Sequence, residues 1–181
     1  MNNKLTTDQL KELLEIQKKF DSRISTLNLQ DSKVAYVVEF FEWFNTLETF
    51  KNWKKKPGKT LDIQLDELAD MLAFGLSIAN QTLGYSDTWT KEEEIEIATE
   101  SINKNDTLID FSYERGTRRY LTSIVSTTLG NDIEPLQQAL RALHIAKSYY
   151  SVEQLTTAYK KKMERNHARQ DGTADTDKGY V

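Results

Sequence analysis

The sequence contains no cysteine, and it has only two prolines and seven glycines among its 181 residues. Without cysteine the chain cannot form a disulfide, a thiolate zinc site or a cysteine nucleophile. So few glycines and prolines argue against a β-sandwich or barrel, because those folds need many turns. The sequence has no run of about 18–20 apolar residues, the length that spans a bilayer, and its first residues lack the pattern of a signal peptide. We therefore expect a cytoplasmic protein that does not enter a membrane.

The charges are close to balanced, with 28 acidic and 24 basic residues and a formal net charge of −4. A general nucleic-acid-binding surface carries an excess of lysine and arginine, because it must neutralise phosphates. The small acidic excess therefore disfavours a nucleic-acid polymer as a partner.

Apolar residues recur at helical spacing along most of the chain, with no convincing strand. Two capping boxes mark helix starts, because Thr6 with Gln9 and Thr90 with Glu93 can cap each other. Further helices are expected over about 32–47 and 61–80, and after Gly116, Asp132 and Ser151.

The sequence therefore predicts an all-α multi-helix bundle with a single domain over residues 1–170. From residue 171 to residue 181 the composition becomes polar, with two glycines and three aspartates. A segment of this kind cannot bury enough apolar surface to fold alone. We expect it to be a flexible tail that a ligand can order.

Segment 34–45 is apolar nearly all round, which is typical of a buried helix. Its polar members are Glu39, Glu42 and Asn45, each three residues from the next. At roughly 100° per residue they form one narrow stripe along the helix. Carboxylates are seldom buried without a cationic partner, so a positive charge should meet this stripe.

The next helix repeats this arrangement, with Glu67 and Asp70 three residues apart among apolar neighbours. A short basic loop over 51–59 precedes it, and a short connection favours antiparallel helices whose acidic pairs face each other. Four carboxylates without cysteine or a nearby histidine are typical of a site for Mg²⁺, or Mn²⁺. Such an ion holds substrate phosphates and can activate water for attack on phosphorus. Two alternatives stay open: the acids are only the solvated face of a helix, or lysines of the loop neutralise them.

The order of these acids resembles a known family. Glu39-x-x-Glu42 followed by Glu67-x-x-Asp70 is similar to the paired ExxE and ExxD motifs of the all-α nucleoside triphosphate pyrophosphatases, the MazG-like group. Three further stretches resemble the dimeric dUTPases of bacteria, phages and trypanosomatids. They are segment 16–24 with Gln17, the stretch from Asn45 through Phe50-Lys51-Asn52-Trp53, and a carboxy-terminal pattern of Tyr159, Lys162, Asn166, His167, Arg169, Gln170, Gly179 and Tyr180.

The resemblance implies a homodimeric helical enzyme that hydrolyses dUTP, and often dUDP, to dUMP. An enzyme of this kind limits the incorporation of uracil into DNA. The resemblance also implies that the four carboxylates are catalytic residues that bind Mg²⁺. They are Glu39, Glu42, Glu67 and Asp70.

Substrate contacts follow from the same resemblance. Gln17 interrupts an apolar helix face and would hydrogen-bond the uracil edge, although a contact between helices would also satisfy a buried amide. Trp53 and Phe74 would line the base pocket, unless these aromatic side chains belong to the core. The tail through Tyr180 would fold over the nucleotide and exclude water. The other implied substrate contacts are Asn45, Lys51, Lys162, Asn166 and Arg169, the last three on the phosphate chain.

Two positions depart from the family pattern. Ala73 stands where relatives often carry histidine, and Met163 stands where asparagine commonly follows the motif lysine. Base selectivity and phosphate contacts could therefore differ. The alternatives are a dCTP-directed or broader MazG-like pyrophosphatase, and a regulatory protein-binding module without turnover. Some phage relatives bind a repressor protein, so a repressor is a further expected partner.

Overall fold

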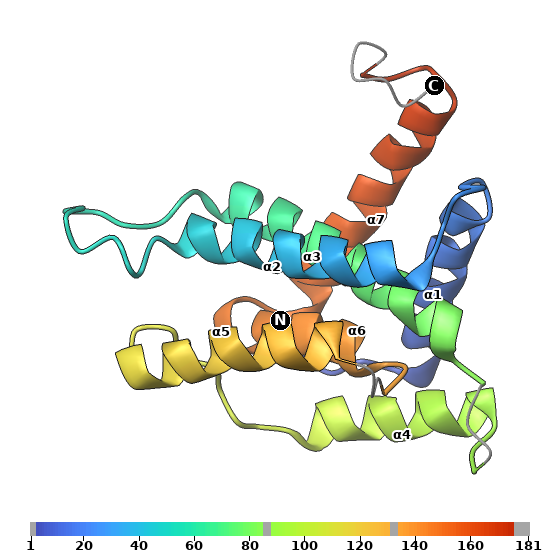
Figure 1. Cartoon of the computed structure of the whole chain (residues 1–181), viewed down its shortest axis with the longest axis horizontal. Helices are drawn as coiled ribbons and strands as arrows, with labels where there is room; N and C mark the ends of the chain where they lie inside the picture. Colours follow the sequence, from blue (N-terminus) through green and yellow to red (C-terminus); the bar gives the residue numbers. More distant parts are fainter. Residues whose placement is uncertain (1–2, 85–87, 131–133, 176–181) are drawn as a thin grey trace.

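The computed structural model describes residues 3–84, 88–130 and 134–175. These residues form seven helices and no strand (Figure 1), which confirms the predicted all-α fold. None of the described helices is long and apolar enough to cross a membrane. The helices are α1 (Thr7–Asp21), α2 (Leu29–Leu47), α3 (Leu61–Thr82), α4 (Lys91–Lys104), α5 (Glu114–Leu129), α6 (Gln137–Tyr149) and α7 (Val152–Gln170).

Side-chain caps explain where several helices begin. The Thr6 hydroxyl accepts a hydrogen bond from the Gln9 amide, and the Gln9 side chain accepts one from the Thr6 amide. Thr90 and Glu93 form the same reciprocal box at the start of α4, so both predicted boxes are confirmed. Helix α2 begins earlier than expected, because the Asn28 side chain caps its first turn.

Helix α3 lies at the centre of the bundle, where it packs against α1, α2, α6 and α7. Helix α2 runs antiparallel beside it, and the long connection between them extends beyond the other helices (Figure 1). Leu68, Leu72 and Leu76 on α3 are fully buried. At Gly75, an added Cβ would lie 2.9 Å from the backbone nitrogen of Ala139 on α6. The two backbones therefore touch directly, and this contact sets the position of α3 against α6.

Helix α7 packs against α1, α3 and α6, and its last turns lead into the tail (Figure 1). Arg23, just after α1, contacts the Asp171 carboxylate at 2.7 Å. Beyond Gly172, which has a φ of 67°, the chain turns back along α7. The backbone amides of Thr173 and Ala174 both donate to a carbonyl of α7, and these bonds hold the start of the tail against the helix.

Two expectations lie outside the described residues. One is Asp132, the residue predicted to cap α6; the cap itself is wrong, because the helix begins at Gln137 and Leu136 holds the N-cap position. The other is closure of the tail through Gly179 and Tyr180 over a nucleotide, which stays a prediction.

Candidate active site

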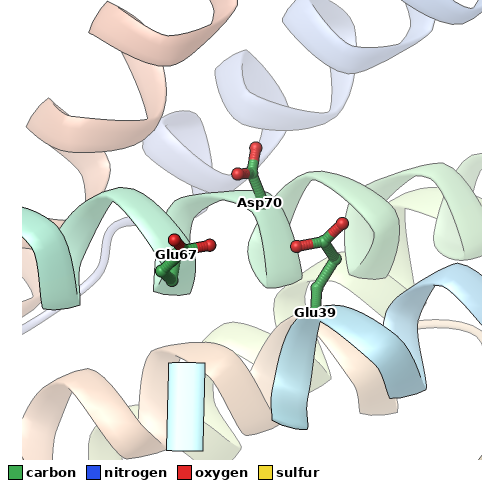
Figure 2. A group of neighbouring side chains, drawn as sticks. All are labelled: Glu39, Glu67 and Asp70. Carbon is green, nitrogen blue, oxygen red and sulfur yellow. The ribbon is translucent and has the colours of Figure 1, made fainter. Parts of the chain in front are cut away.

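Three carboxylates from two neighbouring helices form a cluster, which we call the acidic cluster. Glu39 comes from α2, and Glu67 and Asp70 come from α3, where the spacing of three residues places both on one face (Figure 2). Each offers one carboxylate oxygen, and these oxygens lie within 4.8 Å of one another. All three side chains are half-buried. Oxygen donors gathered in this way match the ligand preference of a hard divalent cation.

Glu42, the fourth predicted ligand, has an exposed side chain and is not part of the acidic cluster. Its charge is nevertheless close enough to raise the pKa of Glu39 and of Glu67. The structure therefore brings three of the four predicted carboxylates together and places the fourth beside them.

Burial and mutual repulsion raise the pKa values of the three carboxylates in the acidic cluster. Burial, followed by the charges of Asp70, Glu42 and Glu67, raises the pKa of Glu39 to about 7. Burial also raises the pKa of Glu67 and of Asp70, with the charge of Asp70 adding to the effect on Glu67. Three acids with raised pKa values at one place are a frequent sign of a functional site.

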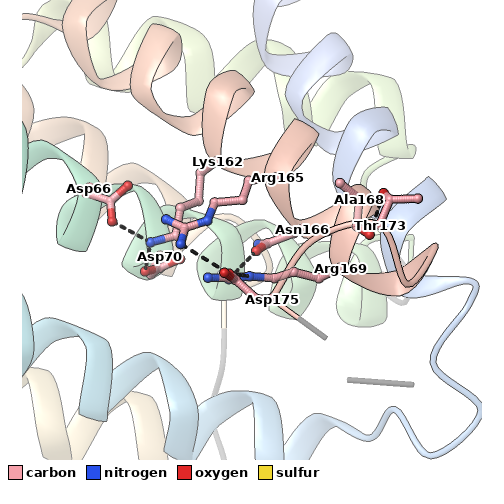
Figure 3. A network of polar contacts seen from close by, with 9 residues as sticks. All are labelled: Asp66, Asp70, Lys162, Arg165, Asn166, Ala168, Arg169, Thr173 and Asp175. Carbon is pink, nitrogen blue, oxygen red and sulfur yellow. Dashed lines mark hydrogen bonds and ion pairs between the residues drawn. The ribbon is translucent and has the colours of Figure 1, made fainter. Parts of the chain in front are cut away.

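Lys162 on α7 reaches this cluster from the side. Its Nζ lies 2.5 Å from Oδ2 of Asp70 and 2.7 Å from Oδ2 of Asp66 (Figure 3). Burial lowers the pKa of Lys162, but hydrogen bonds to both aspartates outweigh it and the pKa is raised. A lysine thus partly neutralises the acids, but it comes from α7 and not from the 51–59 loop.

The lysines of the loop contact a different acid, Glu48, which sequence reasoning missed. Its carboxylate is buried and accepts hydrogen bonds from Nζ of Lys51 at 3.2 Å, Nζ of Lys54 at 2.6 and 2.7 Å, and the Gly58 amide at 3.0 Å. These donors, Lys54 first, lower the pKa of Glu48 to about 2. Glu48 has a φ of 54°, a conformation that costs energy for a residue with a side chain. The sequence contained one sign of this contact, because Glu48 lies just before the lysine-rich 51–59 loop.

This Glu48 contact fixes the loop that carries two predicted substrate contacts. The ammonium group of Lys51 also lies over the Phe50 ring, 5.6 Å from its centroid. Trp53 is 72% exposed at the outer part of the loop. The structure therefore does not place Trp53 in a base pocket.

Gln17 lies on α1, where it is buried against α7. Its Nε2 donates to Oδ1 of Asp21 at 2.7 Å, and its Oε1 accepts from the Tyr159 hydroxyl at 3.0 Å. Both ends of the amide therefore have partners within the chain, and a uracil edge would have to replace one of them. Burial raises the pKa of Asp21, and its Oδ2 has no hydrogen-bond partner among the described residues. Sequence reasoning missed Asp21, because a single acid near a helix end carries no motif.

Asn45 lies on the exposed side of α2, where it lines an aromatic pocket of about 540 Å³ next to α5. Phe74 is half-buried and packs against the hydrophobic core. A larger pocket of about 930 Å³ lies by α4 and α6, but none of the predicted site residues lines it. The apolar part of the aromatic pocket lining consists of Phe41, Phe44, Phe50, Phe111 and Leu121.

The two remaining predicted contacts, Asn166 and Arg169, lie together on α7. Nη1 of Arg169 donates to Oδ1 of Asn166 at 2.8 Å, and Nε of Arg169 donates to Oδ2 of Asp175 at 2.7 Å (Figure 3). Lys162 is one to two turns earlier on the same helix, so α7 presents these groups on the side that reaches the acidic cluster.

One known protein family matches nearly the whole chain. A family model described as dUTPase matches residues 9–173, which includes every described element of the candidate site except the end of the tail. No curated protein matches the chain. The matched residues contain the acidic cluster and the basic groups of α7, and the helical architecture agrees with the family. The chain therefore belongs to the all-α, dimeric dUTPase family, whose activity is that of a dUTP diphosphatase.

Proposed function

We propose that this protein hydrolyses dUTP to dUMP and pyrophosphate in a reaction that depends on Mg²⁺, with Mn²⁺ as a substitute and dUDP as a second substrate. The observation that supports the metal is the acidic cluster. Three half-buried carboxylates converge within 4.8 Å, and one lysine that contacts two acids does not balance their charge. A divalent cation would supply the missing positive charge.

The residues fit this role by their chemistry. Glu39, Glu67 and Asp70 would hold the cation, and Glu42, whose charge acts on Glu39 and Glu67, would join them only if its side chain turned toward the cluster. The bound ion would orient the phosphates and activate water. Since the pKa of Glu39 is about 7, its proton must leave when a cation binds, so affinity should rise with pH through this range.

The basic groups of α7 would bind the phosphate chain. Lys162 already forms an ion pair with Asp70 of the acidic cluster. When a cation binds Asp70, the ammonium group of Lys162 would be released and could contact a phosphate oxygen. Asn166 and Arg169 follow on the same helix and offer an amide and a guanidinium.

The base and sugar contacts remain a proposal from the family resemblance. Gln17, Asn45, Lys51, Trp53 and Phe74 are the proposed residues. Asn45 is supported by its place at the aromatic pocket, whose lining combines aromatic rings with polar groups such as Glu114 and Arg118, a combination that suits a nucleobase or its sugar. Trp53 would have to move inward from its exposed position.

We also propose that the protein is a homodimer. Helix α2 exposes an apolar stripe of Val34, Val38 and Phe41, which are 54%, 47% and 38% exposed. These residues lie at helical spacing on one face, and contiguous exposed apolar surface is typical of an interface. Sedimentation equilibrium would measure the mass directly.

The function is tested by a substrate panel. All deoxynucleoside triphosphates and dUDP are assayed side by side for pyrophosphate or phosphate release, with Mg²⁺, with Mn²⁺ and with a chelator. We expect dUTP to be hydrolysed fastest and the chelator to stop the reaction. Dominant turnover of dCTP would support the dCTP-directed alternative, and no turnover of any nucleotide would favour a regulatory binding module.

A further inference from the structure

Helix α7 carries a second arginine on its basic face. Lys162, Arg165, Asn166 and Arg169 lie at i, i+3, i+4 and i+7, which places all four side chains on one side of the helix. Sequence reasoning assigned three of them to the phosphate chain but not Arg165. The side chain of Arg165 is 51% exposed, whereas that of Arg169 is 12% exposed.

One carboxylate bridges the two arginines. Oδ2 of Asp175 lies 3.1 Å from Nη2 of Arg165 and 2.7 Å from Nε of Arg169 (Figure 3). The same arginine contacts, that of Arg169 first, lower the pKa of Asp175. Two guanidinium groups on neighbouring turns repel each other, so an anion between them is favourable.

The tail is folded so that Asp175 reaches this position. The backbone amides of Thr173 and Ala174 donate to Ala168 O at 2.9 and 3.2 Å, which reverses the chain after α7. Asp175 itself has a φ of 47°. A carboxylate that is held in this way presents oxygen acceptors to two arginines, much as a phosphate group does.

We propose that Arg165 is a further phosphate-binding residue that pairs with Arg169, and that Asp175 occupies their shared anion site until a polyphosphate displaces it. This inference rests on the proposed function, because it concerns the same phosphate chain. Lys162 links the arginine pair to the acidic cluster through Asp70. A phosphate chain held at the cluster can therefore extend along α7 to both arginines.

The simpler alternative is that Arg165 only anchors the tail. The two interpretations differ in the effect of removing the carboxylate. If Asp175 competes with phosphate, its loss frees the anion site and strengthens binding. If the ion pair only anchors the tail, its loss leaves phosphate affinity unchanged or weakens it.

The test is a calorimetric titration with inorganic pyrophosphate in a buffer that contains Mg²⁺. We expect Asp175→Asn to lower the dissociation constant about threefold and Arg165→Gln to raise it about tenfold. In an Arg165→Gln background, Asp175→Asn should have a smaller effect, because half of the shared site is gone.

Matched controls remove the same charges elsewhere. Asp171→Asn removes an acid from the tail that contacts Arg23 instead, and Lys160→Gln removes a cation of α7 that contacts Glu12. Both should bind pyrophosphate within about twofold of the unchanged protein. Equal or weaker binding by Asp175→Asn would overturn the inference, as would unchanged binding by Arg165→Gln.

The readout separates this inference from the proposed function, because pyrophosphate binding needs no turnover. If dUTP is hydrolysed but Asp175→Asn binds pyrophosphate no more tightly, the inference fails and the function stands. If no nucleotide is hydrolysed but both variants behave as expected, the anion site stands and the function fails.

Discussion

The acidic cluster and the basic face of α7 carry opposite charges. They also differ in whether their charged groups have ion-pair partners within the chain. Of the three acids of the cluster, only Asp70 contacts Lys162, and all three keep raised pKa values. The cations of α7 contact acids of the chain itself, Lys162 with Asp66 and Asp70 and the two arginines with Asp175. One region thus lacks positive charge, and the other holds internal carboxylates where a substrate could bind.

The largest effect is expected from the acidic cluster. Glu67→Gln should reduce the rate of dUTP hydrolysis by more than the roughly 10–100-fold typical of residues that only orient metal ligands. Steady-state kinetics in Mg²⁺ would measure this, with Glu96→Gln on α4 as a control for an exposed acid.

Glu42→Gln decides whether three or four acids are needed: a loss as large as that of Glu67→Gln would place Glu42 among the ligands.

Lys162 connects the two regions, so its removal should affect stability as well as binding. Lys162→Met leaves Asp70 without its cation, and the free energy of unfolding should fall by about 1–3 kcal/mol without a divalent ion. Urea unfolding should show this loss shrinking when Mg²⁺ is added, because the ion then neutralises the aspartate. A loss that does not depend on Mg²⁺ would argue against a cation at the cluster, and Lys160→Gln serves as the control.

The Glu48 contact offers a comparison with the basic face, since it also pairs lysines with an internal acid. Glu48→Gln removes the charge of a carboxylate that accepts four hydrogen bonds, and we expect the free energy of unfolding to fall. Limited proteolysis should cut the 51–59 loop faster in this variant. If the loop resists proteolysis as before, backbone contacts and not Glu48 hold it.

A further effect is expected from pH. Since the pKa of Glu39 is raised from an ordinary 4.5 to about 7, the stability it contributes is present at low pH and is lost as the pH rises from about 5 through 7. Thermal unfolding without Mg²⁺ should therefore show a midpoint that declines over this range. The decline should be weaker in Glu39→Gln and in the presence of Mg²⁺, and an equal decline in Glu39→Gln would assign it to other groups.

The sequence predicted those features that depend on neighbouring residues. The spacing of three between Glu67 and Asp70 fixes their common face in any helix, and Thr6 and Thr90 identify helix starts through contacts within one turn. The antiparallel pairing of α2 with α3 was predicted from a short connection, and the two helices pair in this way although residues 48–60 separate them. These are local rules, so they needed no knowledge of the tertiary structure.

Contacts between distant residues could not be predicted in this way. Lys162 meets Asp66 across 96 positions of the chain, and Gln17 meets Tyr159 across 142. The amide of Gln17 suggested a ligand, but a buried amide is equally satisfied by another helix. Composition alone indicated a flexible tail, and it carried no sign that Asp175 would contact two arginines.

Gly75 shows that the geometry of the candidate site depends on a residue outside it. The acids of α3 keep their place because the α3 backbone lies directly on that of α6, with Ala139 filling the space where any side chain would extend. Asp70 is less than two turns away on the same rigid helix. Gly75→Ala should therefore slow dUTP hydrolysis although Gly75 is not part of the candidate site, because the added methyl group would meet the Ala139 backbone and push α3, with Asp70, out of position.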